Sequence, residues 1–354
     1  MILLNPGPVN VSERVRAALT RDDICHREPE YAELQDRIRA RLVQAFAPRG
    51  GFTAVLLTGS GTAALEAAVT SVLSERGRLV VVSNGVYGER IAAIAAAARL
   101  PHTVVQGSWT AAPDLDALDR LLRERDVEAV AVVHHETTTG LRNPVGDVAR
   151  LARSRGKLVL VDAVSGVAGD PLDLADLDLV VGTGNKCIQA FPGLAFVLAR
   201  SEVMARLAGH PRRSFYLALP IHHEAQERRT VPFTPAIQLA YALDEALAEL
   251  LDEGVDGRIA RYAAAAAQLR AGFTRLGLRF LLPPELRSNS ITSLSLPAGR
   301  TYAAIHDGLR ERGFVIYEGQ GRLAREIFRV ANMGHLGSAD FDRFLAALGE
   351  VLGR

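Results

Sequence analysis

Residues 177–196 read LDLVVGTGNKCIQAFPGLAF, and the fold of the whole chain can be worked out from this stretch. An apolar strand pattern, LDLVV, runs into Gly-Thr-Gly, Asn185 and Lys186, and a second apolar strand pattern, LAFVLA, follows. Glycine permits a tight turn between the two strands, so the pattern holds one lysine between buried segments. Such a lysine either caps a structural element or acts as an amine nucleophile with a lowered pKa, and taken alone the structural interpretation is favoured.

Similar strand patterns alternate with helix-like segments before this stretch. Strands are predicted at residues 52–58, 79–83, 102–105, 128–133 and 158–162, most of them apolar on both faces. Parallel strands are buried on both faces and are usually connected by helices. The alternation therefore predicts an α/β fold with a mostly parallel sheet.

The chain after residue 200 is organised differently. Residues 200–235 are irregular and rich in proline, and such long connections are usually functional or lie at an interface. Long helices then lead to short strands at 291–296, 314–318 and 327–331, interleaved with helices at 301–312 and 339–352. We therefore expect an N-terminal arm at 1–15, a large domain at 16–250 and a smaller C-terminal α/β domain at 251–354.

The composition of the 354 residues excludes several classes of partner. The 41 basic and 40 acidic residues are mixed along the chain, so neither a nucleic-acid groove nor a membrane-binding face is expected. The chain has only two cysteines, Cys25 and Cys187, which predicts a reducing compartment such as the cytoplasm. The N-terminus lacks a signal-peptide pattern, and the apolar run at 91–98 is too short to cross a bilayer. Small molecules are the expected ligands.

Five polar loops or residues follow predicted strands: GSGT at 59–62, NGVYGER at 84–90, HHETTTG at 134–140, Asp162 and Lys186. In an open α/β sheet the ligand lies outside the carboxyl ends of the strands, so these groups are expected to converge. GSGT opens a helix, whose free N–H groups can hold a phosphate. The segment GSGTAA has alanine in place of the third glycine of the dinucleotide motif, which that motif sometimes allows, but no acidic residue ends the next strand. GTGNK does not have the spacing of a P-loop.

Three further side chains have both a structural and a functional interpretation. Asp162 is either a turn residue or a buried carboxylate that needs a cationic partner. Tyr87 either packs under a helix or lays its ring over a flat heterocycle, and Arg329 either lies at an edge or points inward to an anionic ligand. Pyridoxal phosphate would use all of them, because it needs a lysine for a Schiff base, a carboxylate opposite its pyridine nitrogen and a phosphate cradle at a helix start. No metal site is expected.

With these motifs in place, the chain resembles the class V, fold type I pyridoxal-phosphate aminotransferases over essentially its full length. The resemblance rests on blocks that occur in the same order: LNPGPVNVSERV, GSGTAALEAAV, NGVYGER, HETTTG, VDAVSG, GNKCIQAFPGLAFV and FRVANMGHL. It implies pyridoxal 5'-phosphate as cofactor and a homodimer with a shared active site. The NKCIQ block is most similar to the branch that moves an amino group from 2-aminoethylphosphonate to pyruvate, giving phosphonoacetaldehyde and alanine.

The resemblance also assigns roles to individual residues. Lys186 would bind the cofactor covalently and later shuttle a proton, Asp162 would pair with the pyridinium nitrogen, and Tyr87 would stack on the ring. The other cofactor contacts would come from Ser60, Gly61, Thr62, Thr137 and Asn185, and from Thr230 of the second subunit. Arg329 would bind the substrate carboxylate, and Gly7 would belong to the same substrate-binding set. Arg27 is added to that set as a separate hypothesis, because its segment departs from the family pattern.

Two other activities fit the same motifs. One is an alanine or serine:glyoxylate transaminase. The other is a pyridoxal-phosphate-dependent lyase of the desulfurase kind, which needs a mobile cysteine; Cys187 directly follows the lysine and is poorly placed for that role. Residues 23–31, DICHREPEY, also depart from the acidic and aromatic version of the aminoethylphosphonate branch, and there His26 and Arg27 could supply a cation for a phosphonate.

Overall fold

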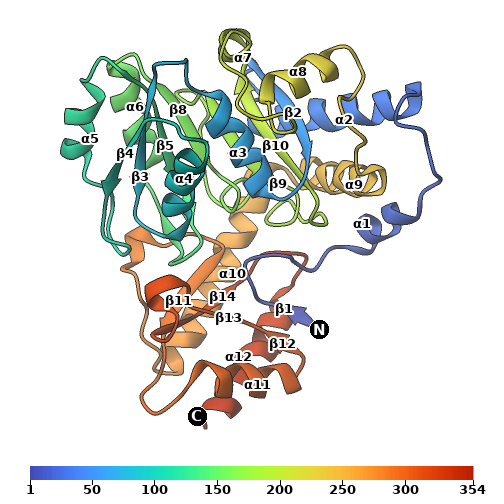
Figure 1. The fold of residues 1–354 in the computed structure, drawn as a ribbon. Coiled ribbons are helices and arrows are strands. Elements are labelled where there is room, and N and C mark those ends of the chain that lie inside the picture. The colour runs from blue at the N-terminus through green and yellow to red at the C-terminus, as the bar shows by residue number, and fades with distance from the viewer. Residues whose placement is uncertain (354) are drawn as a thin grey trace.

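A seven-stranded sheet forms the centre of the larger, upper part of the molecule in Figure 1. In this computed structural model, which describes residues 1–353, the strand order is β2-β10-β9-β8-β5-β3-β4. The strands are β2 (Phe52–Thr58), β3 (Arg78–Ser83), β4 (His102–Gln106), β5 (Val127–Val133), β8 (Leu158–Asp162), β9 (Leu179–Thr183) and β10 (Leu194–Arg200). β10 runs antiparallel to β2 and β9, and the other neighbouring pairs are parallel. The predicted α/β fold with a mostly parallel sheet is confirmed.

Helices cover both faces of this sheet, which explains why its strands are apolar on both sides. One face packs against α2 (Pro29–Phe46), α5 (Leu115–Leu122), α6 (Val145–Ser154) and α9 (Ile237–Glu253). The other face packs against α3 (Gly61–Ser71), α4 (Val86–Ala97), α7 (Ser201–Leu207) and α8 (Leu219–Glu227). Successive side chains of β3 alternate between the two cores: Val80 and Val82 enter the first, and Val81 enters the second.

The lower part of the molecule in Figure 1 has a core of its own. It contains α10 (Val255–Arg275), α11 (Tyr302–Glu311), α12 (Ser338–Leu352) and an antiparallel sheet of β11 (Ile291–Ser295), β14 (Ile327–Ala331) and β13 (Tyr317–Glu318). The short 3-10 helices are Ala18–Thr20, Pro284–Leu286 and Gly321–Leu323. The division of the chain at residue 250 stays a prediction.

The N-terminal segment joins this lower part. β1 (Ile2–Leu3) pairs in parallel with β12 (Phe314–Val315), and α1 (Glu13–Ala17), capped by Ser12, follows on the side of the large sheet. The single strand predicted at 314–318 was therefore wrong. It is divided at the fully buried Ile316 into β12, which pairs with β1, and β13, which pairs with β14 in a different sheet.

Several helices also differ from the sequence prediction. The 18-residue α2 was not predicted, and it begins at Pro29, inside the DICHREPEY segment. α4 begins at Val86, so the NGVYGER segment, which was expected to be a polar loop, is mostly helical. α7 and α8 interrupt the stretch 200–235 that was expected to be irregular.

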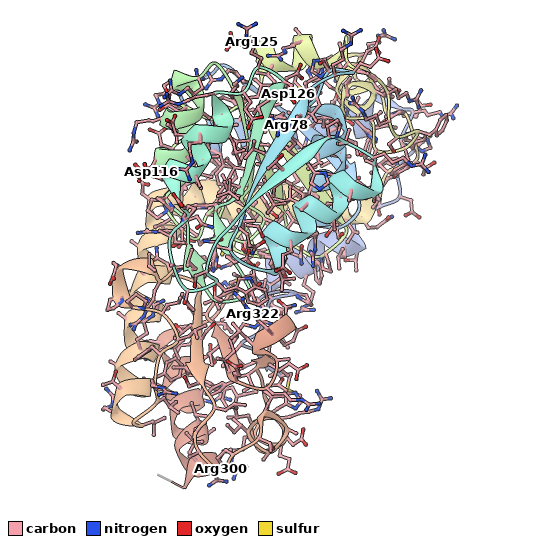
Figure 2. The ribbon with its side chains drawn as sticks, turned by 60° about the vertical axis from the view of Figure 1, so that its left-hand side comes forward. Arg78, Asp116, Arg125, Asp126, Arg300 and Arg322 are labelled. Carbon is pink, nitrogen blue, oxygen red and sulfur yellow. The ribbon has the colours of Figure 1, made fainter. Side chains whose placement is uncertain are left out.

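The two parts of the molecule meet near Trp109, in the loop after β4. Trp109 packs with Leu323 and Ile327 from the lower part, and the Arg322 guanidinium lies 4.2 Å from the centre of its ring. Figure 2 shows Arg322 at the level where the two parts join. An aromatic side chain with a cation over its face thus fastens β14 and its neighbours to the carboxyl edge of the large sheet.

Candidate active site

Lys186 lies in the turn after β9, at the carboxyl edge of the parallel strands. The turn is closed by hydrogen bonds from Ala190 N to Gly184 O at 2.8 Å and from Gly184 N to Leu194 O at 3.2 Å. The lysine is 9% exposed, and its Nζ donates to the Pro6 carbonyl. Burial lowers the pKa of Lys186 to about 8, because a charged amine is poorly solvated there. The structure therefore gives the lysine the environment of a nucleophile.

Gly7 lies directly against this turn. Its backbone has a φ of +95°, and a Cβ added to it would come within 3.0 Å of the Asn185 carbonyl oxygen and 3.4 Å of Lys186 Cγ. A larger residue would be strained in this conformation and would press on the lysine stem. The Asn185 side chain is held by Thr183, whose Oγ1 donates to Asn185 Oδ1 at 2.9 Å.

Asp162 is the last residue of β8 and is buried beside the lysine turn. Its Oδ1 accepts from Val164 N at 3.0 Å. Burial raises the pKa of Asp162, while attraction to Arg90 and Lys186 acts in the opposite direction. The predicted carboxylate and the predicted amine are thus electrostatically coupled within one buried site.

The N-terminus of α3 presents the predicted phosphate cradle. Ser60 is the N-cap residue, but its side chain makes no capping hydrogen bond, and the residue is exposed. A Cβ added to Gly61 would lie 2.8 Å from Val164 Cγ2, so α3 approaches the loop after Asp162 as closely as a glycine permits. Thr62 Oγ1 accepts from Arg90 Nη1 at 3.3 Å. The start of α3 therefore lies in the same site as Asp162, and the Arg90 guanidinium lies beside it.

Tyr87 and Arg90 share the first turns of α4. The Arg90 guanidinium lies 4.5 Å from the centre of the Tyr87 ring. Burial raises the pKa of the Tyr87 hydroxyl, and the positive charges of Arg90 and Arg329 oppose that rise. Sequence reasoning found the tyrosine but missed the role of Arg90, although it quoted the segment that contains both residues.

Glu136 is a second residue that sequence reasoning missed. Its carboxylate is fully buried and accepts from Tyr87 N at 3.3 Å, from Gly88 N at 3.2 Å and from Thr138 Oγ1 at 2.6 Å. A Cβ on Gly85 would lie 2.2 Å from Glu136 Cδ, so only glycine fits there. Glu136 therefore replaces the side-chain cap that Gly85 cannot give to α4. A lone acid in the otherwise uncharged HHETTTG segment was the available signal.

The HHETTTG segment was expected to be a polar loop, and that expectation was wrong. Residues 134–140 are buried, and part of the segment forms a small hairpin of β6 (His135–Glu136) and β7 (Leu141–Arg142). Thr137 Oγ1 is hydrogen-bonded to Ser165 Oγ at 2.7 Å. Side chains of this loop satisfy one another's polar atoms, which is why a polar sequence can be buried here.

Arg329 on β14 is buried and points toward this loop. Its Nη1 donates to the Thr137 carbonyl at 2.9 Å and to Gln320 Oε1 at 3.1 Å, and its Nε donates to the Glu318 carbonyl at 2.9 Å. Within residues 1–353, Nη2 has no hydrogen-bond partner. Burial lowers the pKa of Arg329. The inward orientation predicted from the sequence is observed.

Two predicted residues lie outside this group. Thr230, at the end of α8, and Arg27, in the loop before α2, are exposed. No hydrogen bond or ion pair links either of them to Lys186, Asp162 or Arg329 among the described residues. The loop with Arg27 runs along α9, where Gln238 Nε2 donates to Asp23 Oδ1 at 2.9 Å, at the right-hand edge of Figure 1.

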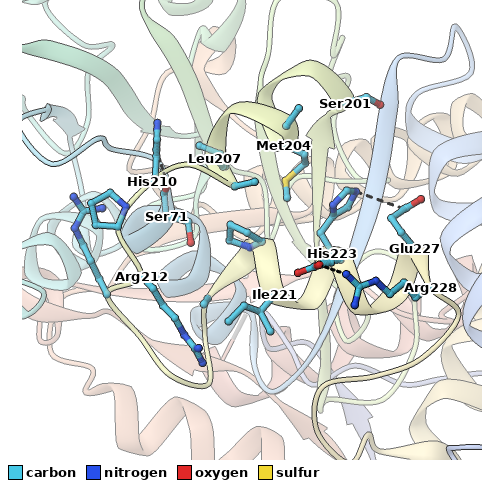
Figure 3. A pocket seen from close by; sticks show the side chains of 17 residues that line it. Ser71, Ser201, Met204, Leu207, His210, Arg212, Ile221, His223, Glu227 and Arg228 are labelled. Carbon is cyan, nitrogen blue, oxygen red and sulfur yellow. Dashed lines mark hydrogen bonds and ion pairs between the residues drawn. The ribbon is translucent and has the colours of Figure 1, made fainter.

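A separate pocket of about 670 Å³ lies beside α7 and α8 (Figure 3). It is lined by Met204, Leu207, His210 and Ile221 among others, and by no predicted site residue. α7 follows the antiparallel β10, so this pocket lies at the opposite edge of the sheet from Lys186. In the part of the chain that the structure describes, no helix is long and apolar enough to cross a membrane, and no group of His, Cys, Asp or Glu is arranged to hold a metal ion.

The sequence is similar to known proteins over its full length. A family profile described as aminotransferase class-V matches residues 13–331. A 2-aminoethylphosphonate–pyruvate transaminase of Vibrio vulnificus (strain YJ016) is 38% identical over 359 residues, covering 99% of this chain and 97% of the relative. The protein of the same name from Syntrophobacter fumaroxidans is 39% identical, covering 100% of this chain and 96% of the relative.

Solved structures give the same picture of the fold. An aspartate aminotransferase from Thermus thermophilus superposes with a TM-score of 0.91 at 29% identity, covering 100% of this chain and 99% of the other. An alanine–glyoxylate aminotransferase from Nostoc sp. superposes with a TM-score of 0.92 at 28% identity, covering 99% of this chain and 95% of the other.

Proposed function

The chain belongs to the class-V aminotransferase family, and on this premise we propose that it transfers the amino group of 2-aminoethylphosphonate to pyruvate. The enzyme is an aminotransferase, and its cofactor is pyridoxal 5'-phosphate. The products of the proposed reaction are phosphonoacetaldehyde and alanine. Relatives that carry this activity in their names, at 36–39% identity over at least 98% of this chain, support the assignment.

The residues of the site fit this cofactor. Gly61 packs so closely on Val164 that an added Cβ would fill the space, and the Ser60 side chain is free of capping duty, so the start of α3 can hold a phosphate. Tyr87 offers a ring to stack on, and Asp162 a buried carboxylate for the pyridine nitrogen. When bound, the cofactor supplies an electron sink for the carbon that carries the amino group.

Lys186 performs the chemistry that belongs to the chain itself. Its pKa of about 8 makes a substantial fraction of the amine neutral in mildly basic solution. A neutral amine is the form in which Lys186 would hold the cofactor, and a free neutral amine can move a proton at the reacting carbon. The Pro6 carbonyl, which accepts from Nζ, is positioned to orient the amine while it is free.

The observation that carries the choice of substrate is the presence of two guanidinium groups beside Tyr87. Arg90 and Arg329 both act electrostatically on Tyr87 and on Lys186. Both substrates are anions, since the donor has a phosphonate and the acceptor has a carboxylate. Arginine pairs well with either group through parallel N–H donors. Two arginines in one site therefore suit a reaction in which two small anions bind in turn.

A donor screen tests the proposal. The purified enzyme, loaded with cofactor, is given 2-aminoethylphosphonate, alanine or serine as donor and pyruvate or glyoxylate as acceptor, and the amino acid formed is quantified. We expect the highest kcat/KM for 2-aminoethylphosphonate with pyruvate. A preference for alanine or serine with glyoxylate would instead support the second transaminase activity, which the similarity to the Nostoc enzyme brings into consideration.

The buried position of Cys187 speaks against the lyase alternative. Burial raises the pKa of its thiol to about 12, and its Sγ lies against Gly169, where an added Cβ would come within 2.7 Å. A protonated, enclosed thiol cannot move to a substrate. The remaining cysteine, Cys25, is exposed in the loop before α2. Two free cysteines also support our proposal of a cytoplasmic location.

A homodimer that completes the active site is also part of the proposal. Thr230 is exposed, and so is Phe215, at 74%; the Phe215 ring is tilted against Phe233, which in turn stacks on Tyr216. Such an apolar surface is typical of an interface. Light scattering should give twice the chain mass, and Thr230→Ala should weaken cofactor binding without changing that mass. A monomer with full activity would contradict the shared site.

The role of the loop that contains Arg27 stays a prediction with a simple test. Arg27→Ala should raise the KM for 2-aminoethylphosphonate and leave the KM for pyruvate unchanged, because a cation in this loop would bind only the phosphonate group. An unchanged KM for the donor would remove Arg27 from the substrate-binding set.

A further inference from the structure

We propose that Tyr262 and Gln189 are positioning residues for Lys186. They hold the lysine turn at a fixed position relative to β14, the strand that carries Arg329. The inference rests on the proposed aminotransferase function and deepens it. Neither side chain is hydrogen-bonded to a predicted cofactor contact. Their importance lies in how they connect three separate parts of the chain.

Gln189 ends the lysine turn in an unusual conformation. Its φ is +69°, in the left-handed region that favours glycine, and it is 1% exposed. Its N–H donates to the Lys186 carbonyl at 2.9 Å. A buried, non-glycine residue keeps such a backbone only when its surroundings hold it there. The Gln189 side chain supplies that restraint, because its Nε2 donates to Tyr262 Oη and to the Gly334 carbonyl, both at 2.7 Å.

The Tyr262 hydroxyl on α10 is the centre of this network. It accepts from Gln189 and from Gly334 N, the latter at 3.1 Å, and it donates to the Cys187 carbonyl at 3.4 Å. Arg258, one turn earlier on α10, also donates to the Cys187 carbonyl, at 3.0 Å. Burial raises the pKa of Tyr262 to about 12, so the hydroxyl keeps its proton and stays a donor. A buried network with its members paired is rigid.

Gly334 extends the network to the substrate side. Gly334 follows β14, the strand that carries Arg329. The φ of Gly334 is +102°. Its own position is confined, since an added Cβ would come within 2.9 Å of the Asn10 carbonyl oxygen. One hydroxyl on α10 therefore contacts both the turn after Lys186 and the segment after Arg329. The amine and the anion-binding guanidinium are thereby held at a fixed separation, and a small error in such a separation has a large effect on rate.

The test compares Tyr262→Phe, Gln189→Leu and the double variant in the holoenzyme. Three quantities are measured: the pKa of the visible absorbance of the lysine-bound cofactor, kcat and KM with pyruvate, and the urea midpoint of unfolding. We expect each single variant to shift the absorbance pKa and to lower kcat about 10-fold with a smaller change in KM. The double variant should be no worse than the more severe single variant, because the two side chains act as a unit.

Tyr302→Phe is the matched control. Tyr302 also belongs to the lower part of the molecule, and its hydroxyl donates to the Ile316 carbonyl at 2.9 Å. This variant should lower the urea midpoint and leave the absorbance pKa and kcat unchanged. The proposal is overturned if Tyr262→Phe behaves like this control. The absorbance titration needs no substrate, so it still decides the positioning role if 2-aminoethylphosphonate proves not to be the donor.

Discussion

Replacing Lys186 with methionine in the cofactor-free enzyme should make the protein more stable at neutral pH. Methionine fills a similar volume and removes the buried amine. The pKa of Lys186 is about 8 rather than 10.5, because burial disfavours its charged form. The pKa of this amine is therefore about 2.5 lower in the folded protein than in the unfolded chain. At 1.36 kcal/mol per pH unit, this difference lowers the free energy of unfolding by about 3 kcal/mol when the amine is charged.

The pH dependence of this effect has a definite sign. Between pH 8 and 10.5 the folded protein binds fewer protons at this position than the unfolded chain. The free energy of unfolding of the Lys186 protein should therefore rise with pH across that window relative to the variant. Below pH 8 the charged amine lowers the free energy of unfolding by the full amount of about 3 kcal/mol. Its hydrogen bond to the Pro6 carbonyl offsets about 1 kcal/mol of that loss. Near pH 10.5 the amine no longer lowers the free energy of unfolding.

Urea unfolding of both cofactor-free proteins at pH 7, 8, 9 and 10 measures this difference. The comparison removes the contribution of the titrating groups that do not interact with Lys186, since both proteins share them. We expect the variant to be about 2 kcal/mol more stable at pH 7, and the difference to close or reverse by pH 10. Stability curves that run parallel over the whole range would refute the lowered pKa, and with it the physical basis for Lys186 as a nucleophile.

Three further predictions address the surroundings of the lysine. Glu136→Ala should lower the free energy of unfolding by about 3 kcal/mol or more, measured in urea, because it leaves two backbone N–H groups of α4 and the Thr138 hydroxyl without their acceptor. Glu136→Gln, which keeps one acceptor oxygen, should lose less than half as much. Gly61→Val should weaken binding of pyridoxal phosphate, followed by absorbance titration, because its Cβ would meet Val164 at 2.8 Å; full affinity would show that α3 can shift. Arg329→Lys should raise the KM for pyruvate about 10- to 100-fold, since lysine cannot reproduce the planar set of donors, whereas the exposed Arg300→Lys should leave it unchanged. Equal KM values for the two variants would exclude a role for Arg329 in binding the acceptor.

The sheet and most of its site could be predicted because their signals are local. Each parallel strand is a short apolar run, and each run is followed by glycine or polar residues. Since parallel strands present their carboxyl ends on one edge, Asp162 and Lys186 could be placed together without any coordinates. Gly7 could be placed only through the resemblance, because nothing local shows that a residue near the N-terminus reaches a turn after β9.

α2 escaped prediction because its stability depends on long-range partners. Its buried apolar residues Leu34, Ile38 and Leu42 are few among charged ones. Several of those charges are used elsewhere in the fold: Arg41 donates to the Asp244 carbonyl at 2.7 Å, and Arg39 donates to the Ala54 carbonyl at 2.8 Å. A helix that is held by such contacts looks like a solvated segment when only its own sequence is considered.

The roles of Glu136 and Arg90 could not be derived from spacing for a related reason. Both residues belong to segments that were correctly placed after strand ends, but their hydrogen-bond partners lie on other segments. Glu136 accepts from backbone N–H groups of α4, and Arg90 donates to Thr62 on α3. A buried carboxylate cannot be distinguished from an exposed one by its sequence position. Only the positions in space of the N–H groups that donate to it show that it caps α4.

The pairing of β1 with β12 also constrains the order in which the protein can be made. Ile2 pairs with Phe314, and the Leu4 carbonyl accepts from Ala331 N at 2.7 Å. A ribosome that adds about 5–20 residues per second needs roughly 15 to 60 s between these two parts of the chain. Throughout that interval the segment that carries Pro6 and Gly7 has no partner strand, even after the large sheet, whose last strand ends at Arg200, has been synthesised. The nascent enzyme therefore completes the surroundings of its lysine only when the last strands have left the ribosome.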